Sequence, residues 1–220
     1  METNEVWSNQ QEFINNYSKR TLLNGGIVLN DFNELSHAIR KDRSYMNIAD
    51  LGCWTGLTTA YWGNIAKMNQ GKVVAVDDFS GRSEEDFIDL ANTFNIPEIF
   101  ERNMKQMKLE EIVKLKIGHV VDVAGDYTDN YFDIIFVDAT YEYNGMKALL
   151  DAWYPKLKKG GLMCGFNADV IVDEEFKANY PDKDMNYFIK YFRGVDVAVG
   201  EKFVKGVSTT TGSLWKWRNK

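Results

Sequence analysis

From Tyr45 onward, short apolar runs alternate with longer segments of helical periodicity. Apolar runs predict strands at 46–51, 73–76, 112–117, 132–137 and 162–166. Apolar residues three and four positions apart predict helices from about 57 to 68, after 83, and over 143–158. This alternation is typical of an α/β fold with a doubly wound, mostly parallel sheet and helices on both faces.

The two ends of the chain follow other patterns. Residues 1–44 predict an N-terminal helical extension, with amphipathic helices over 5–19 and 30–41, ahead of a main domain spanning 45–220. Near the C-terminus, two short strand-like runs flank Gly212 and predict an antiparallel hairpin at the sheet edge. The aromatic-rich segment 173–192 fits either an ordinary pair of amphipathic helices or a lid over a substrate.

Composition narrows the class of protein. The 220 residues carry a net charge of −6, so there is no domain-wide basic surface for nucleic acid. No apolar run reaches the 18 residues of a membrane span, and the acidic, polar N-terminus does not resemble a signal peptide. Cys53 and Cys164 have no metal-binding spacing and suggest reduced thiols. We therefore expect a cytoplasmic protein that binds neither membrane nor nucleic acid.

The loop after the first predicted strand discriminates between cofactors. It reads D-x-G-x-x-x-G, from Asp50 through Gly52 to Gly56. Trp54 and Leu57 occupy the positions that a dinucleotide fingerprint gives to glycine, so NAD binding is not expected. The chain also lacks a phosphate-binding G-x-x-x-x-G-K-[ST] loop.

Acidic residues at two strand ends favour a different ligand. Asp50 suits a positively charged amine, and the glycines beside it allow close approach of the backbone. Asp77, at the end of the second strand, is placed to accept hydrogen bonds from both hydroxyls of a ribose. A nucleoside that carries an amino acid fits both, and S-adenosylmethionine (SAM) is such a molecule.

Five segments in order resemble one family of enzymes. They are residues 48–59, 76–81, 132–138, 153–162 and 214–218. Together they are similar to the motifs of class I SAM-dependent methyltransferases, within them the macrocin- and cephalosporin-hydroxylase-like O-methyltransferase group. The resemblance covers roughly 45–220. It implies a Rossmann-like fold and SAM-dependent methylation of a small-molecule acceptor, with oxygen the expected methyl-accepting atom; a homodimer is compatible with it.

The resemblance also implies a set of cofactor-binding residues. They are Asp50, Gly52, Cys53, Trp54, Gly56, Asp77, Asp78, Phe79, His119 and Asp138. Two interpretations stay open for three of them. Trp54 either contacts the cofactor or belongs to the core. Phe79 either stacks on adenine or only packs. His119 takes the place of a polar group that touches adenine in many relatives, and it either makes that contact or does not.

The chain departs from the group where a metal and a base are expected. The fourth strand is followed by Asp138-Ala139-Thr140-Tyr141 where relatives carry a second acid and a histidine, and the fifth by Phe166-Asn167 in place of His-Asp. One carboxylate and an amide make a weak Mg²⁺ site, so we predict no metal. Asp138, Tyr141 and Asn167 are the candidate catalytic residues.

Two other functions remain open at this point. One is a non-catalytic SAM-binding or scaffold protein that has lost its metal and base. The other is an N- or C-methyltransferase of the same fold, although the chain has no D/N-P-P-Y element for methylating amides or adenine.

Overall fold

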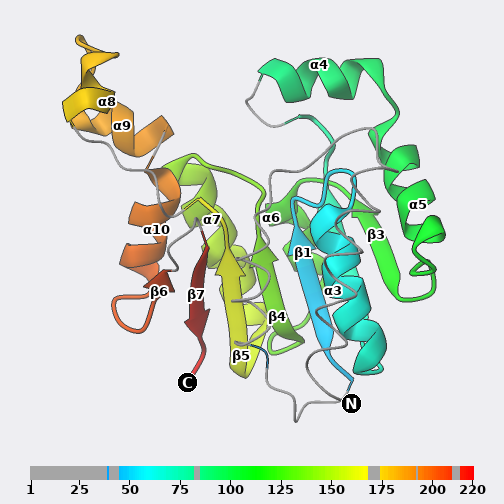
Figure 1. The fold of residues 1–220 in the computed structure, drawn as a ribbon. Helices are drawn as coiled ribbons and strands as arrows, with labels where there is room; N and C mark the ends of the chain where they lie inside the picture. The colour runs from blue at the N-terminus through cyan, green and yellow to red at the C-terminus, as the bar shows by residue number, and fades with distance from the viewer. Residues whose placement is uncertain (1–38, 40–44, 82–84, 168–173, 192, 210–213) are drawn as a thin grey trace.

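The structure is a computed structural model that describes residues 39, 45–81, 85–167, 174–191, 193–209 and 214–220 (Figure 1). Apart from Ile39, the predicted N-terminal helices lie outside the described residues. The strands are β1 (Asn47–Leu51), β2 (Lys72–Asp77), β3 (Val113–Ile117), β4 (Phe132–Val137), β5 (Leu157–Gly165), β6 (Ser208–Thr209) and β7 (Trp215–Arg218). The α-helices are α3 (Leu57–Met68), α4 (Glu85–Thr93), α5 (Ile96–Gln106), α6 (Val120–Val123), α7 (Tyr143–Trp153), α8 (Glu174–Ala178), α9 (Met185–Tyr191) and α10 (Gly194–Lys202). Short 3₁₀ turns, η1 (Ala124–Asp126) and η2 (Tyr154–Lys156), follow α6 and α7.

The strands form one mixed sheet in the order β3-β2-β1-β4-β5-β7-β6. Neighbouring strands from β3 to β5 are parallel, whereas β7 runs antiparallel to both β5 and β6. The predicted doubly wound sheet and its C-terminal hairpin are therefore confirmed. From β1 the strands β2 and β3 follow to one side of the sheet, and β4 and β5 follow to the other side. Ligands of such sheets bind beyond the carboxyl ends of the strands at this switch point.

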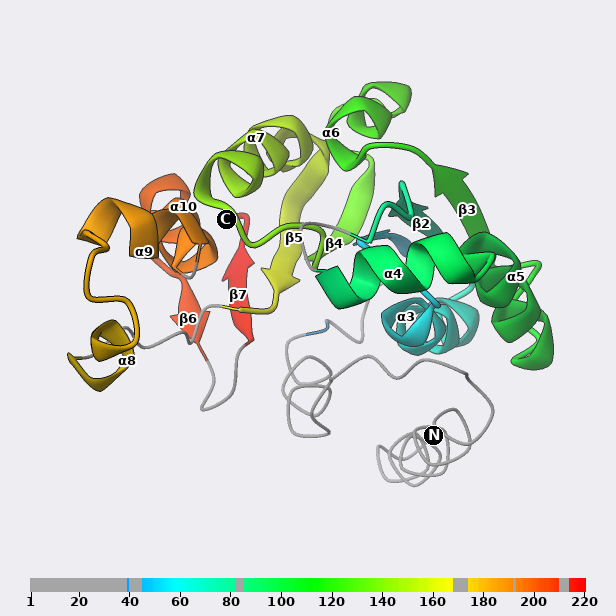
Figure 2. The same ribbon diagram turned by 90° about the horizontal axis from the view of Figure 1, so that it is seen from above.

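Helices cover both faces of the sheet (Figure 2). On one face, α7 and α10 pack on apolar residues of β1, β4, β5 and β7. On the other face, α3 packs on β1, β4 and β5, and α5 packs beside it against a third apolar cluster. Every residue of β4 is buried, as expected for a central strand enclosed on both faces. Its acid, Asp133, is ion-paired with Lys158 Nζ at 2.7 Å.

The predicted helix over 143–158 is too long, and the fifth strand begins earlier than predicted. Helix α7 ends at Trp153, and β5 already begins at Leu157. Pro155 is the physical reason, because it lacks an N–H and cannot continue the helical ladder. The carbonyls of Pro155 and Lys156 instead accept hydrogen bonds from the N–H groups of Asn130 and Tyr131, at 3.0 and 2.9 Å, which ties this turn to the approach of β4.

Helix α5 was not predicted from the sequence, although its signals are present. The side chain of Asn95 caps the helix by accepting from Glu98 N, and a proline lies in the first turn. Its buried residues include Ile96, Ile99, Phe100 and Met104. The helix supports the cofactor loop directly, because Asn103 Nδ2 donates to the carbonyl of Thr55 at 2.9 Å in a buried position.

The aromatic segment after β5 contains two short helices, α8 and α9. Phe176, Tyr180, Tyr187 and Phe188 contact one another with ring centroids 5.6 to 6.3 Å apart. Figure 1 shows these helices extending beyond the body of the sheet, on the side of α10. The helix pair is thus confirmed, and a role as a lid stays a prediction. No helix in the part of the chain that the structure describes has the length and apolar character to cross a membrane.

Candidate cofactor site

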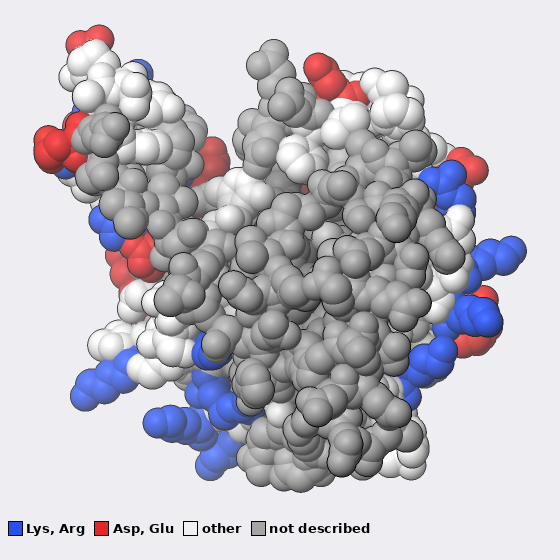
Figure 3. Space-filling view, in the orientation of Figure 1, with Lys and Arg blue, Asp and Glu red and all other residues white. Residues whose placement is uncertain are grey.

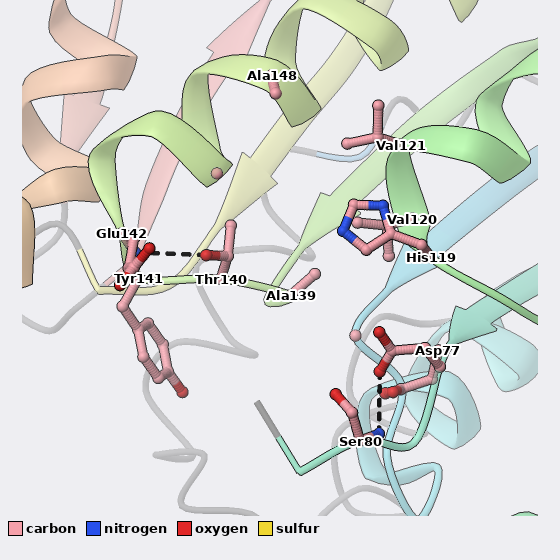
Figure 4. Close-up of a pocket in the computed structure, with 13 residues that line it drawn as sticks. Asp77, Ser80, His119, Val120, Val121, Ala139, Thr140, Tyr141, Glu142 and Ala148 are labelled. Carbon is pink, nitrogen blue, oxygen red and sulfur yellow. Dashed lines mark hydrogen bonds between the residues drawn. The ribbon is translucent and has the colours of Figure 1, made fainter. Parts of the chain in front are cut away.

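A cavity of about 400 Å³ opens at the carboxyl ends of the strands (Figure 4). Its wall contains Gly52 after β1, Asp77 at the end of β2, His119 after β3 and residues 139–142 after β4. Strand ends that are far apart in the sequence therefore meet around one space. Figure 4 shows the His119 ring on the side of the cavity opposite the β4 loop, with Asp77 below it.

Two glycines shape the loop after β1. Gly52 has a φ of +87°, and a Cβ there would lie 2.2 Å from the carbonyl oxygen of Asp138. Gly56 has a φ of +93°, and a Cβ there would lie 2.6 Å from Met104 Cε on α5. Only glycine fits such a conformation in such a space. The first glycine keeps the loop close to the end of β4, and the second lets α3 begin against α5.

Asp77 holds the first two strand ends together. Its Oδ2 accepts from the N–H of Trp54 at 2.7 Å, and its Oδ1 accepts from the N–H of Phe79 at 2.8 Å. The side chain is partly buried and lies in the cavity wall. A carboxylate oxygen has two lone pairs, so each can accept a further hydrogen bond from a ligand hydroxyl. The neighbouring Asp78 is exposed, and its Oδ1 accepts from Ser80 N at 2.9 Å.

Asp50 has a different environment, because it lies behind the cavity wall. The residue has no solvent exposure. Its Oδ2 accepts from the hydroxyls of Thr58 and Thr59, at 2.9 and 2.5 Å, while its Oδ1 has no hydrogen-bond partner among the described residues. The pKa of Asp50 rises from its ordinary 3.8 to about 7, mainly because of burial and with smaller contributions from the nearby carboxylates Asp138 and Asp77, against the lowering effect of the two hydroxyls.

Three other predicted cofactor residues lie mainly in the core. Phe79 has a φ of +56° and is 8% exposed, within the apolar cluster beneath α5, and this placement favours packing over stacking on adenine. Cys53 is buried in the same cluster. Trp54 is half-buried, and its ring meets that of Phe87 on α4 edge-on, with centroids 5.3 Å apart. His119, in contrast, is exposed on the cavity wall just before α6.

The three candidate catalytic residues are not all brought to the cavity. Tyr141 lies in its wall, although Figure 4 shows its ring turned away from His119 and Asp77. Asp138 is half-buried directly before the wall residues, and its N–H donates to the carbonyl of Leu51 at 2.8 Å. Asn167 follows β5 with a φ of +66° and is not among the wall residues. The other candidate considered for a cation, Asp169, lies outside the described residues.

Within the described ranges, no group of three or more His, Cys, Asp or Glu is arranged to hold a metal ion. The prediction that the reaction needs no metal stays a prediction.

Burial also raises the pKa of the Cys164 thiol well above its usual range, so this cysteine is an inert core residue.

Some wall residues were missed by the motif analysis. Ser80, Thr140 and Glu142 all line the cavity. The Thr140 hydroxyl accepts from the N–H of Glu142 at 3.3 Å, which shapes the turn before α7. The sequence pattern marks Thr140 only as a replacement for an acid. The available signal was position at a strand end, because Ser80 lies in the segment 76–81 and Thr140 and Glu142 follow the segment 132–138.

Fold and site together define a class of protein. Its members have an open α/β sheet and bind a nucleoside ligand at the switch point between the two directions in which the strands are added. A comparison with family models matches residues 49–165, more than half of the chain, to the family described as "Methyltransferase domain". The chain belongs to this family. It is therefore a SAM-dependent methyltransferase of class I, and S-adenosylmethionine is its cofactor.

Solved structures share the fold at low sequence identity. An O-methyltransferase from Bacillus cereus, in complex with S-adenosylhomocysteine (SAH), is 15% identical with a TM-score of 0.58, covering 100% of this chain and 93% of that one. A candidate O-methyltransferase from Klebsiella pneumoniae is 14% identical with a TM-score of 0.61, covering 98% and 90%. A candidate caffeoyl-CoA O-methyltransferase from Staphylococcus aureus is 19% identical with a TM-score of 0.56, covering 96% and 99%. No curated protein matches the chain.

The residues present suit the cofactor. Asp77 places a carboxylate in the wall, Gly52 brings the backbone close, and the buried Asp50 has an oxygen without a hydrogen-bond partner among the described residues. Figure 3 shows most of the acidic side chains in view on the upper half of the molecule, and most of the basic ones along the lower and right-hand edges.

Proposed function

We propose that the protein transfers a methyl group from SAM to a hydroxyl oxygen of a small-molecule acceptor. The observation that carries this proposal is the cavity that lies between Asp77 on β2 and the loop 139–142 after β4. The bound cofactor supplies an electrophilic methyl group on a positively charged sulfur. The named O-methyltransferase from Bacillus cereus, whose fold the chain shares, supports oxygen as the methyl-accepting atom.

On the cofactor side, Asp77 accepts hydrogen bonds from the ribose hydroxyls, and Gly52 lets the backbone approach. Asp78 and His119 complete the wall around the nucleoside. On the acceptor side, Asp138 orients the hydroxyl, because the residues that follow it form the opposite wall. Tyr141 is a candidate base and Asn167 a further polar group near the acceptor. Alignment of the two reactants supplies most of the rate enhancement, so a strong base is not required.

The test combines binding with an acceptor screen. Calorimetric titration with SAM and SAH establishes cofactor binding, and incubation with SAM labelled on its methyl group detects transfer to phenols, catechols, sugars and amines. Label in an O-methyl product supports the proposal. SAM binding without transfer to any acceptor favours the non-catalytic alternative, and label on nitrogen or carbon favours the N- or C-methyltransferase. The Asp77→Ala variant is the control for transfer that depends on the cavity.

The cellular setting is also part of the proposal. We infer a cytoplasmic enzyme with a small-molecule acceptor, no nucleic-acid partner and a homodimeric assembly. The net charge of −6 supports the absence of a nucleic-acid partner. Sedimentation of the purified protein tests the homodimer, and a binding assay with RNA and DNA at low salt tests the nucleic-acid expectation.

A further inference from the structure

Asp50 is a buried carboxylate whose two oxygens differ in their hydrogen bonding. Helix α3 provides two hydroxyl donors to Oδ2, from Thr58 and Thr59, whereas Oδ1 has no hydrogen-bond partner among the described residues. An unpaired buried carboxylate is costly, and such a group tends to keep its proton. The residue nevertheless lies two positions before Gly52, which forms part of the cavity wall. It is therefore screened from solvent but not from the field of a bound ligand.

The groups that face Asp50 supply no positive charge. The end of β2 contributes Asp77 and the end of β4 contributes Asp138, and both raise the energy of the ionised form. From β5, the buried thiol of Cys164 interacts with Asp50, and the cations Lys216 and Arg218 on β7 lower the pKa of that thiol. The main groups that shift the pKa of Asp50 include no cation, so the positive charge of a bound ligand would favour its ionised form.

The two forms of the cofactor differ in this charge. SAM has a sulfonium, an ammonium and a carboxylate, so its net charge is positive, whereas SAH has lost the sulfonium charge and is neutral overall. We propose that Asp50 is the residue by which the site distinguishes the cationic donor from the neutral product: it releases a proton to solvent when SAM binds and takes one back when SAM has become SAH. This inference rests on the proposed SAM-dependent function.

The consequence for turnover follows from the sign of the linkage. Because SAM stabilises the ionised carboxylate, SAM binds more tightly when Asp50 has already lost its proton. After transfer, the sulfonium charge is gone and the remaining ammonium is offset by the ligand's own carboxylate, so Asp50 takes up a proton, which removes one attraction to the product. Asp50 thereby acts as a positioning residue for cofactor exchange, since it lies behind the wall rather than in it.

Isothermal titration in two buffers of different ionisation enthalpy measures the protons released per ligand bound. The carboxyl of Asp50 has a pKa of about 7 in the protein without cofactor. We therefore expect about half a proton released per SAM bound at pH 7, and a clearly smaller number per SAH bound. We also expect SAM affinity about tenfold stronger at pH 8 than at pH 6, because about a tenth of the carboxyl is ionised at pH 6. The affinity for SAH should change much less over this range.

Variants separate Asp50 from other groups. Asp50→Asn should abolish the proton release and make the ratio of SAM to SAH affinity independent of pH. Asp133→Asn is the matched control, because it replaces another buried strand acid that is not among the cavity-wall residues, and it should leave that ratio as pH-dependent as in the wild type. Thr59→Val keeps the carboxylate but removes one donor, so the pH of half-maximal SAM affinity should rise by about one pH unit.

The outcomes are decisive even if Asp50→Asn fails to fold. Equal proton release with SAM and SAH in the wild type, or release that persists in Asp50→Asn, overturns the inference. An unchanged pH midpoint in Thr59→Val also overturns it. Failure of the proposed function looks different, because SAM then does not bind at any pH.

Discussion

The clearest physical consequence of the structure is that ionisation of Asp50 opposes folding of the protein without cofactor. The carboxyl is fully buried, and its pKa rises from 3.8 to about 7 on folding. The folded chain therefore retains a proton that the unfolded chain has lost, and stability falls as pH rises from about 4 to about 7. The total loss is on the order of 4 kcal/mol, of which about 3 kcal/mol falls between pH 5 and pH 8.

Urea unfolding of the cofactor-free protein at pH 5 and pH 8 tests this, with Asp50→Asn measured in parallel. The amide cannot ionise, so the variant should gain about 3 kcal/mol relative to wild type between the two pH values. Comparing the pH dependence cancels the fixed cost of placing an amide against Thr58 and Thr59. If wild type and variant keep the same difference in stability at both pH values, the carboxyl is already ionised in the folded protein at pH 5, and the reasoning fails.

Asp133→Asn is the matched control for this experiment. Asp133 is also a buried strand acid, but Lys158 Nζ lies 2.7 Å from its Oδ2, and the N–H of Asn47 donates to the same oxygen at 3.0 Å. Removing its charge should destabilise the protein at pH 8 by roughly 1–3 kcal/mol, because the paired cation and the N–H lose their ionised acceptor.

Three further predictions concern ligands. Asp77→Ala should weaken SAM binding by roughly ten- to a hundredfold in calorimetry, from the loss of charge-assisted hydrogen bonds; circular dichroism must show an intact fold, because the same carboxylate holds the N–H groups of Trp54 and Phe79. NAD(H) should not bind, since Trp54 and Leu57 stand where a dinucleotide needs glycine, and micromolar affinity would contradict this. Asp138→Asn should lower turnover while SAM affinity stays nearly intact, and EDTA should not change the rate; loss of activity in EDTA with recovery in Mg²⁺ would show a metal site.

The sequence predicted the strands of the sheet well because their burial is extreme. The run 132–137 is β4 residue for residue, since a strand covered on both faces must be apolar at every position that has no ionic partner. The boundary between α7 and β5 was wrong because apolar spacing continued through Leu157, while Pro155 had already ended the helix. Helix α5 was missed although its apolar residues Ile96, Ile99, Phe100 and Met104 recur at helical spacing after the cap residue Asn95.

The site was predicted less completely because its residues lie in loops of unusual backbone geometry. Phe79 and Trp54 both have positive φ values, and in Phe79 the side chain joins the core. Apolar periodicity contains no information about such turns, so a motif can identify the loop without saying which of its side chains reach the ligand. Among the wall residues, Ser80 lies within the segment 76–81 but was not singled out, and Thr140 and Glu142 lie just beyond the segment 132–138.

Asp50 and Asp77 show how similar sequence signals can have different physical meanings. Each is an acid near the end of a strand in the cofactor motifs. Asp77 is the last residue of β2, lies in the cavity wall and accepts hydrogen bonds from two backbone N–H groups. Asp50 is the residue before the last one of β1 and is fully buried beneath α3. Backbone donors at the wall allow one carboxylate to offer its remaining lone pairs to a neutral ligand hydroxyl. Without a nearby cation, the buried carboxyl of Asp50 keeps its proton. Substitution at Asp77 should therefore weaken SAM affinity at every pH, whereas substitution at Asp50 should change how that affinity depends on pH.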